Sequence, residues 1–156
     1  MSAPLAYDGT YLKSISGILK ICCMICCFLG FLCIVCSSVQ LHNFRGCFYN
    51  AIVGLAFLCS GCMLLARLFQ VWQRKFLTFN AIKYELYVNV FLACCCFIGG
   101  CVSISLDVIA YTVATFFIFL AFSFYVFDAY LCYRIYRQCD AQTQTQTQIP
   151  TQPQMA

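Results

Sequence analysis

Four apolar stretches, each long enough to cross a lipid bilayer, fill most of this chain. They run over Ile18–Val39, Phe48–Phe69, Ile82–Ser105 and Ile109–Tyr133. About 20 helical residues cross a hydrocarbon core about 30 Å thick, so each stretch suffices for one transmembrane helix. The stretches are continuously apolar and do not alternate, which excludes a transmembrane β-barrel. The sequence therefore predicts an all-α membrane protein, an antiparallel four-transmembrane-helix bundle with short connections.

The composition excludes the soluble class of proteins. Hydrophobic residues make up 63% of the 156 residues and charged residues only 9%, whereas soluble domains carry about 25% charged residues. We expect residues 1–17 to form a cytoplasmic N-terminal lead and residues 18–137 to form the transmembrane domain. Residues 138–156 are rich in Gln and Thr, so a disordered cytoplasmic tail is predicted there.

The distribution of Lys and Arg predicts the orientation in the membrane. Arg45 lies in the first connection, and the other eight of the nine basic residues lie on the opposite side. Because basic residues favour the cytoplasmic side, both termini and the middle connection are expected there. The expected location is the plasma membrane, vesicles or both. In the middle connection, Trp72, Arg74 and Lys75 are predicted to contact the membrane surface.

Five ionisable residues lie at membrane depth, all near the predicted cytoplasmic ends of the helices: Lys20, Arg67, Lys83, Glu85 and Asp128. We expect them to form one structural layer, in which Asp128 pairs with Arg67, Lys83 or Lys20 and fixes the helix register. Ion or proton transport is the competing hypothesis. It requires polar groups across the midplane, where the residues are mostly apolar or small and Asn50 and Asn89 are isolated amides.

Fifteen cysteines raise the question of a metal site. Three Cys-x-x-Cys pairs have the spacing of half a zinc site, but the chain has one histidine and the pairs lie within apolar helices. We therefore interpret most cysteines as small packing residues and expect no metal or cofactor.

Two other cysteine chemistries stay open. Cysteines near the cytoplasmic face can be S-palmitoylated, and the candidates are Cys132 and Cys139, with Cys22 and Cys23 as weaker ones. Cys36 and Cys47 bracket the first exterior connection, where an oxidising compartment would allow a disulfide. In the second helix, Gly54 and Gly61 share one face, which favours close helix packing there.

The two ends of the predicted bundle resemble a known family. The entry Tyr11-Leu-Lys-Ser-Ile-Ser-Gly-Ile-Leu-Lys20 is similar to that family's aromatic-Leu-basic-Ser start of the first helix, and Phe124–Arg134 is similar to its last helix. Together with the four spans and short exterior connections, residues 10–137 resemble the MARVEL-domain proteins, a group that includes the myelin-and-lymphocyte protein, plasmolipin and the chemokine-like-factor transmembrane group. The cysteine-rich first helix and the Gln-Thr tail depart from the family. The resemblance implies a role in membrane apposition, lipid-ordered domains (lipid rafts) and vesicle traffic.

The sequence contains no catalytic constellation, because it lacks a second histidine, a paired carboxylate motif and a phosphate-binding loop. We therefore expect a non-enzymatic membrane-organising protein that acts in membrane apposition, lipid-domain organisation, vesicle trafficking or cell-junction assembly. Its expected partners are membrane lipids and other membrane proteins, including further copies in a homo-oligomer, and not nucleic acid. The alternative is a small channel or transporter, or an accessory subunit of one.

Overall fold

The computed structural model describes residues 11–37, 44–69, 78–104 and 108–147, which form four long helices and one short turn of 3-10 helix. The helices are α1 (Ile15–Val35), α2 (Phe44–Leu68), α4 (Thr78–Ser103) and α5 (Ile109–Thr147), and η1 (Tyr11–Lys13) precedes α1. Each long helix contains a segment long and apolar enough to cross a membrane. The predicted all-α bundle of four transmembrane helices is confirmed.

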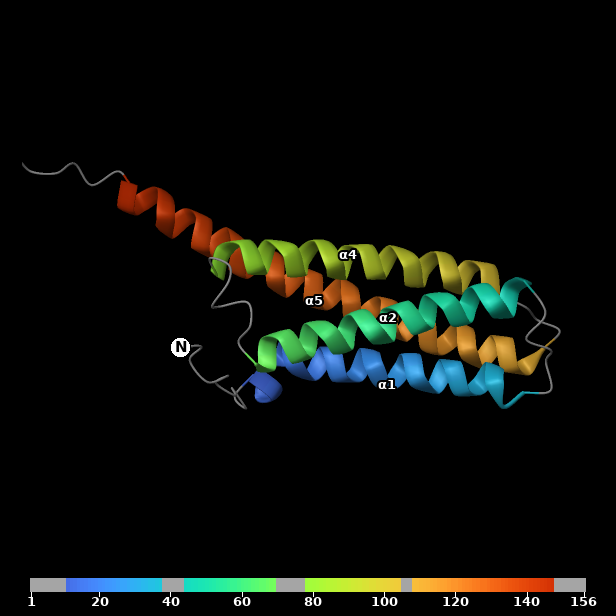
Figure 1. Ribbon diagram of the computed structural model, residues 1–156. Coiled ribbons are helices and arrows are strands. Elements are labelled where there is room, and N and C mark those ends of the chain that lie inside the picture. Colours follow the sequence, from blue (N-terminus) through green and yellow to red (C-terminus); the bar gives the residue numbers. More distant parts are fainter. Residues whose placement is uncertain (1–10, 38–43, 70–77, 105–107, 148–156) are drawn as a thin grey trace, which may run out of the picture.

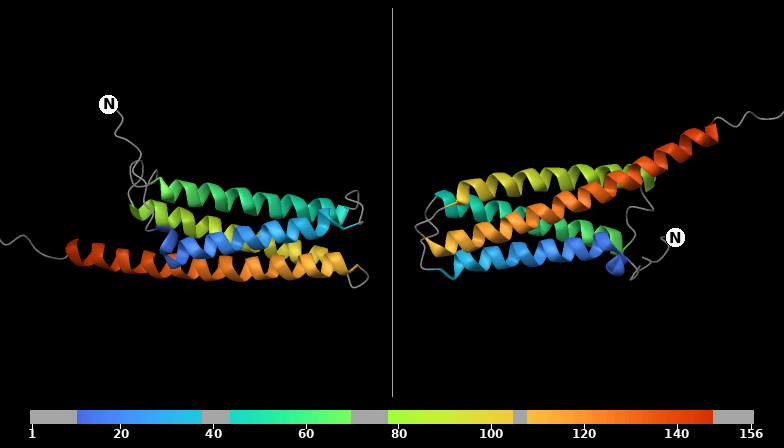
Figure 2. Two further views of the ribbon diagram at one scale, coloured as in Figure 1. Left: turned by 90° about the horizontal axis from the view of Figure 1, so that it is seen from below. Right: turned by 180° about the vertical axis from the view of Figure 1, so that it is seen from behind.

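The helices run antiparallel to their chain neighbours (Figure 1). Helix α1 packs against α2 and α5, and α4 packs against the same two helices. The two turned views agree with this arrangement and show α5 extending well past the other helices (Figure 2). The turn η1 and the last turns of α5 lie at one end of the bundle, which we call the η1 end.

The centre of the bundle is built from small residues, tyrosines and a few aliphatic side chains such as Leu92 and Ile118. Cys96, Ala114 and Ala121 are fully buried, as is Tyr49. Many large apolar side chains point outward, and Leu58 and Phe116 expose 65% and 63% of their surface. Small residues inside allow helices to approach closely, and large apolar residues outside suit hydrocarbon. This distribution is that of a bundle surrounded by lipid.

Two buried tyrosine hydroxyls connect α2 with α5. The Tyr49 hydroxyl of α2 donates to the Ala114 carbonyl of α5 over 2.8 Å. In the other direction, the Tyr125 hydroxyl of α5 lies 2.5 Å from the Ser60 hydroxyl and 3.3 Å from the Ala56 carbonyl of α2. A buried tyrosine needs such a partner, so these contacts fix how far each helix is rotated and shifted against the other.

Helix α1 begins at a well-defined cap. The Ser14 hydroxyl accepts a hydrogen bond from the Gly17 amide at 3.2 Å and donates to the Tyr11 carbonyl at 2.6 Å. The backbone of η1 therefore lies directly against Gly17, where an added Cβ would contact the Tyr11 carbonyl oxygen. The cap begins α1 at Ile15, three residues before the predicted span.

The tail prediction is wrong for residues 138–147, which continue α5 to Thr147. Extending an existing helix requires no new nucleation, and the Gln and Ala residues of this segment are good helix formers. The composition favoured disorder because the repeat cannot bury itself, but a helix already begun supplies the missing nucleus. Residues 148–156 lie outside the described residues.

Close helix packing was also expected at Gly54 and Gly61 of α2, and the structure does not show it there. A Cβ added at Gly54 would meet nothing within 4 Å, and one at Gly61 would meet only the Met24 methyl group at 3.7 Å. The close approaches occur at other glycines, among them Gly30 and Gly99. Spacing shows that two glycines share a face, but it does not show which face meets a neighbouring helix.

Candidate functional site: a buried charge network

Charged and amide side chains gather inside the η1 end of the bundle. Lys20 of α1, Glu85 and Asn89 of α4, and Asp128 of α5 are each exposed by 2% or less. Arg67 from the last turn of α2 reaches the same group. All four long helices therefore contribute to one cluster, which we call the charge network.

Lys20 lies at the centre of the charge network. Its Nζ lies 2.8 Å from Asp128 Oδ2, 3.1 Å from Glu85 Oε1 and 3.2 Å from Asn89 Oδ1. The ammonium group donates hydrogen bonds to Asp128 Oδ2 and Asn89 Oδ1, and its contact with Glu85 Oε1 is an ion pair. One side chain of α1 thus contacts both α4 and α5.

Asp128 is held by neutral donors as well. Asn89 Nδ2 donates to Asp128 Oδ2 over 2.7 Å, and the Ser16 hydroxyl donates to Oδ1 over 2.6 Å. Asn89 therefore accepts from Lys20 through its oxygen and donates to Asp128 through its nitrogen. Both carboxylate oxygens of a fully buried acid have donors, which lowers the cost of keeping it charged in this environment.

The second ion pair joins α2 to α4. Arg67 Nε donates to Glu85 Oε2 over 3.0 Å, and Arg67 Nη2 contacts the same oxygen. The Arg67 side chain keeps 20% of its surface exposed, whereas Glu85 keeps 3%. Two cations now face two carboxylates, so the charge network carries no net charge. Removing any one of its four charged members leaves an uncompensated buried charge, which costs far more than the intact pair contributes.

Four of the five residues expected to form a charge layer come together here, and Lys83 does not. Lys83 is exposed and takes part in none of the ion pairs found among the described residues. Positions two apart on a helix point in different directions, so burial of Glu85 turns Lys83 outward. Of the three partners considered for Asp128, the structure pairs it with Lys20.

Sequence reasoning missed the role of Asn89, which was expected to be an isolated amide. Glu85 and Asn89 are separated by four positions, so they share a face of α4, and that face is the buried one. This spacing was a usable signal for Asn89. Ser16 carried no comparable signal, because its contact with Asp128 depends on how α1 is placed beside α5.

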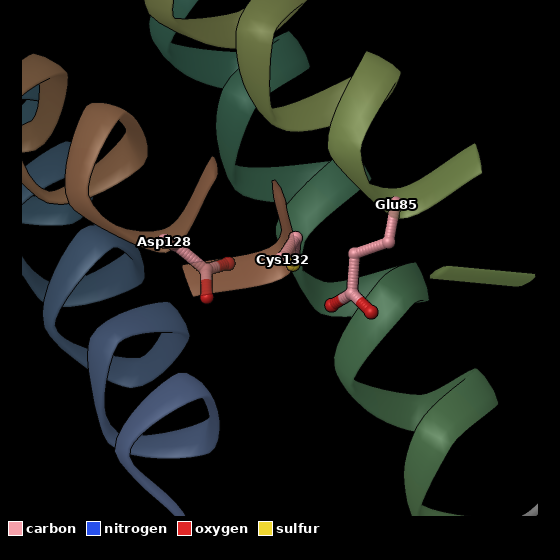
Figure 3. Close-up of side chains that lie close together, drawn as sticks. All are labelled: Glu85, Asp128 and Cys132. Carbon is pink, nitrogen blue, oxygen red and sulfur yellow. The ribbon is translucent and has the colours of Figure 1, made fainter. Parts of the chain in front are cut away.

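Three potential metal ligands lie together in the charge network: Glu85, Asp128 and Cys132 (Figure 3). Their ligand atoms lie within 4.8 Å of one another. Both carboxylates are already paired with protein cations, and Lys20 Nζ contacts both of them. A metal ion would have to displace Lys20 from these oxygens. The arrangement is therefore that of an ion-pair network built from the protein's own side chains.

The cysteines considered for palmitoylation are mostly turned inward. Cys132 and Cys23 are 5% and 1% exposed, and Cys22 is half-buried. The Cys132 thiol faces Asn89, whose Nδ2 lies 4.0 Å from it. Burial in the folded bundle disfavours acylation of Cys132 and Cys23. The Cys139 side chain lies outside the described part of the chain.

Cys36 and Cys47, considered for a disulfide, are both exposed free thiols in the structure. The bond between them is therefore not formed there. The predicted membrane-surface residues Trp72, Arg74 and Lys75 lie outside the described residues, and their role stays a prediction.

Comparisons of the chain with protein-family models, with curated proteins and with solved structures found no match. The resemblance to MARVEL-domain proteins thus depends on the residues quoted for it and on the four-span architecture. Two of the residues in those stretches, Lys20 and Asp128, form the central ion pair of the charge network.

Proposed function

We propose that this protein is a non-enzymatic membrane-organising protein, acting in membrane apposition, lipid-domain organisation, vesicle trafficking or cell-junction assembly. The observation that carries the proposal is the outer surface of the bundle, where large apolar side chains point outward along all four long helices. Examples are Phe28, Leu58, Phe91 and Phe116, each more than half exposed. Such a surface is covered by acyl chains or by the helices of other membrane proteins.

The inside of the bundle supports the same proposal. Between the charge network and the opposite end, packed side chains such as Tyr49, Leu92, Cys96 and Ile118 fill the core. The buried charges are collected in one compensated group, and the surface along the spans is largely apolar. A rigid bundle that presents a continuous apolar surface is suited to contacts with lipids, with other membrane proteins and with copies of itself.

The proposed orientation places the η1 end, with both termini, in the cytoplasm. We predict that Cys47, kept as the sole cysteine, reacts with a membrane-impermeant maleimide added to intact cells, because it is exposed near the start of α2. Cys96 kept alone is the matched control and should stay unlabelled until the protein is denatured, because it is fully buried. Labelling of Cys47 only after permeabilisation would contradict the proposed orientation and indicate the opposite one.

Reconstitution tests the proposed function directly. The purified full chain is placed in giant vesicles of phosphatidylcholine, sphingomyelin and cholesterol that separate into ordered and disordered regions. We expect the protein to concentrate in the ordered or the disordered regions, to change the area of those regions, or to gather where two vesicles touch. Uniform distribution with no effect on region size or vesicle contact would contradict the proposal.

The charge network is the observation that favours a second candidate, a channel or transporter, because buried ionisable groups often mark ion pathways. The same vesicles, loaded with K⁺ or with a pH gradient, measure this activity. A leak that rises with protein content and disappears in an Asp128→Asn variant that is still folded in the vesicles would favour transport. In cells, proximity labelling that returns one dominant transporter would instead favour an accessory subunit.

A further inference from the structure

A cavity of about 550 Å³ opens beside the charge network at the η1 end. Residues from η1 and from all four long helices line it, among them Tyr11, Arg67, Glu85 and Arg134. Its size falls within the range of small-molecule sites in proteins. The cavity has two kinds of wall, one cationic and one apolar.

The cationic wall is made by two arginines. Arg67 engages Glu85 through Nε and Nη2 and keeps part of its side chain exposed. Arg134 is exposed at the cavity, and no ion pair within the described ranges includes it. Because the charge network is already neutral, Arg134 gives this part of the cavity a net positive charge. An anion placed here would meet two guanidinium groups.

Two features without a formal charge also favour an anionic ligand. The Tyr11 hydroxyl is buried and has no hydrogen-bond partner in the described part of the chain, so it can donate to a ligand oxygen. The first turn of α1, around Ser14 and Ile15, also lines the cavity. A helix N-terminus carries partial positive charge and favours anions.

The apolar wall consists of Ile15, Ile82, Leu131 and Ile135. Ile15 and Ile135 are 63% and 48% exposed, although neither lies at the tip of a loop. In a membrane-spanning bundle, the molecules that combine an apolar chain with an anionic group are the surrounding phospholipids. A free inorganic anion would leave this wall without a partner.

We propose that this cavity binds one anionic phospholipid, whose phosphate contacts Arg134 and Arg67 and whose acyl chain lies along Ile15, Ile82, Leu131 and Ile135. The site goes beyond the proposed organising function. It depends only on the four spans and the cavity, so it can stand if that function fails. Arginine pairs with phosphate through charge-assisted hydrogen bonds, which are stronger than neutral ones.

The experiment measures binding to the purified full chain in a neutral detergent. The probes are dioctanoyl phosphatidic acid, dioctanoyl phosphatidylcholine and inorganic phosphate, and native mass spectrometry counts bound molecules. We expect one phosphatidic acid per chain, at least tenfold tighter than either other probe. Arg134→Gln should weaken that binding about tenfold, because one charge-assisted contact is lost while the charge network stays intact.

Arg137→Gln is the matched control, because Arg137 is exposed on the same helix and does not line the cavity. It should leave the affinity unchanged. Leu131→Trp should fill the space beside the apolar wall and reduce phosphatidic acid binding without affecting the arginines. Equal losses in the Arg134 and Arg137 variants would show general surface attraction and overturn the proposal. If phosphatidylcholine binds as tightly as phosphatidic acid, the proposal that the site requires an anionic headgroup is wrong. If inorganic phosphate binds as tightly, the proposal that the site requires an acyl chain is wrong.

Discussion

Lys20→Met is expected to destabilise the bundle by about 3–5 kcal/mol, because it leaves Asp128 buried with no cation beside it. Lys20 contacts Asp128, Glu85 and Asn89 at once, and Asp128 is 1% exposed. Arg67 still compensates Glu85 in this variant, so the loss is concentrated on Asp128. The free energy of unfolding in mixed micelles, obtained by titrating a denaturing detergent, measures the effect.

The double variant Lys20→Met with Asp128→Leu should recover much of this stability. Removing both charges leaves the Arg67–Glu85 pair balanced, and replacing a buried ion pair by apolar side chains is often neutral or stabilising. Lys83→Met is the matched control for the loss of a lysine near a helix end, and we expect it to change stability by less than about 0.5 kcal/mol. A double variant no more stable than Lys20→Met alone would contradict the assignment of Lys20 and Asp128 as a pair.

The members of the charge network could largely be predicted from the sequence, but their pairing could not. Lys20, Arg67, Glu85 and Asp128 stand out because charges within apolar stretches are costly and are therefore placed together. Which cation meets Asp128 depends on the rotation of each helix about its axis. That rotation is set by contacts between residues far apart in the sequence, such as the Tyr49 hydroxyl with the Ala114 carbonyl.

Helix ends show the same limit. Hydropathy located all four spans, because bilayer thickness fixes the length of an apolar helix. It could not locate the first turn of α1, which begins at the Ser14 cap, or the last turns of α5, which contain no apolar pattern. Local hydrogen bonding and helix propagation determine where these helices begin and end, and hydropathy contains no information on either.

Gly30→Ala is expected to cost about 2–4 kcal/mol, although it adds a single methyl group. A Cβ at Gly30 would run into the Tyr49 hydroxyl, and it would also meet Phe117 Cβ at 3.5 Å. Tyr49 is fully buried and donates to the Ala114 carbonyl over 2.8 Å, so it cannot move aside without losing that hydrogen bond. The same unfolding titration measures the loss.

Two further variants separate this clash from a general effect of alanine. Tyr49→Phe removes only the hydroxyl and should cost about 1 kcal/mol, and adding Gly30→Ala to it should then cost clearly less than in the parent chain. Gly54→Ala is the matched control, because nothing lies within 4 Å of the added Cβ, and the better helix propensity of alanine should stabilise α2 by up to about 1 kcal/mol. If Gly30→Ala and Gly54→Ala behave alike, the close approach of α1 to Tyr49 does not hold the bundle together. Opposite signs at two glycines of similar sequence context would show that the packing partner, and not the residue type, decides where this bundle requires glycine.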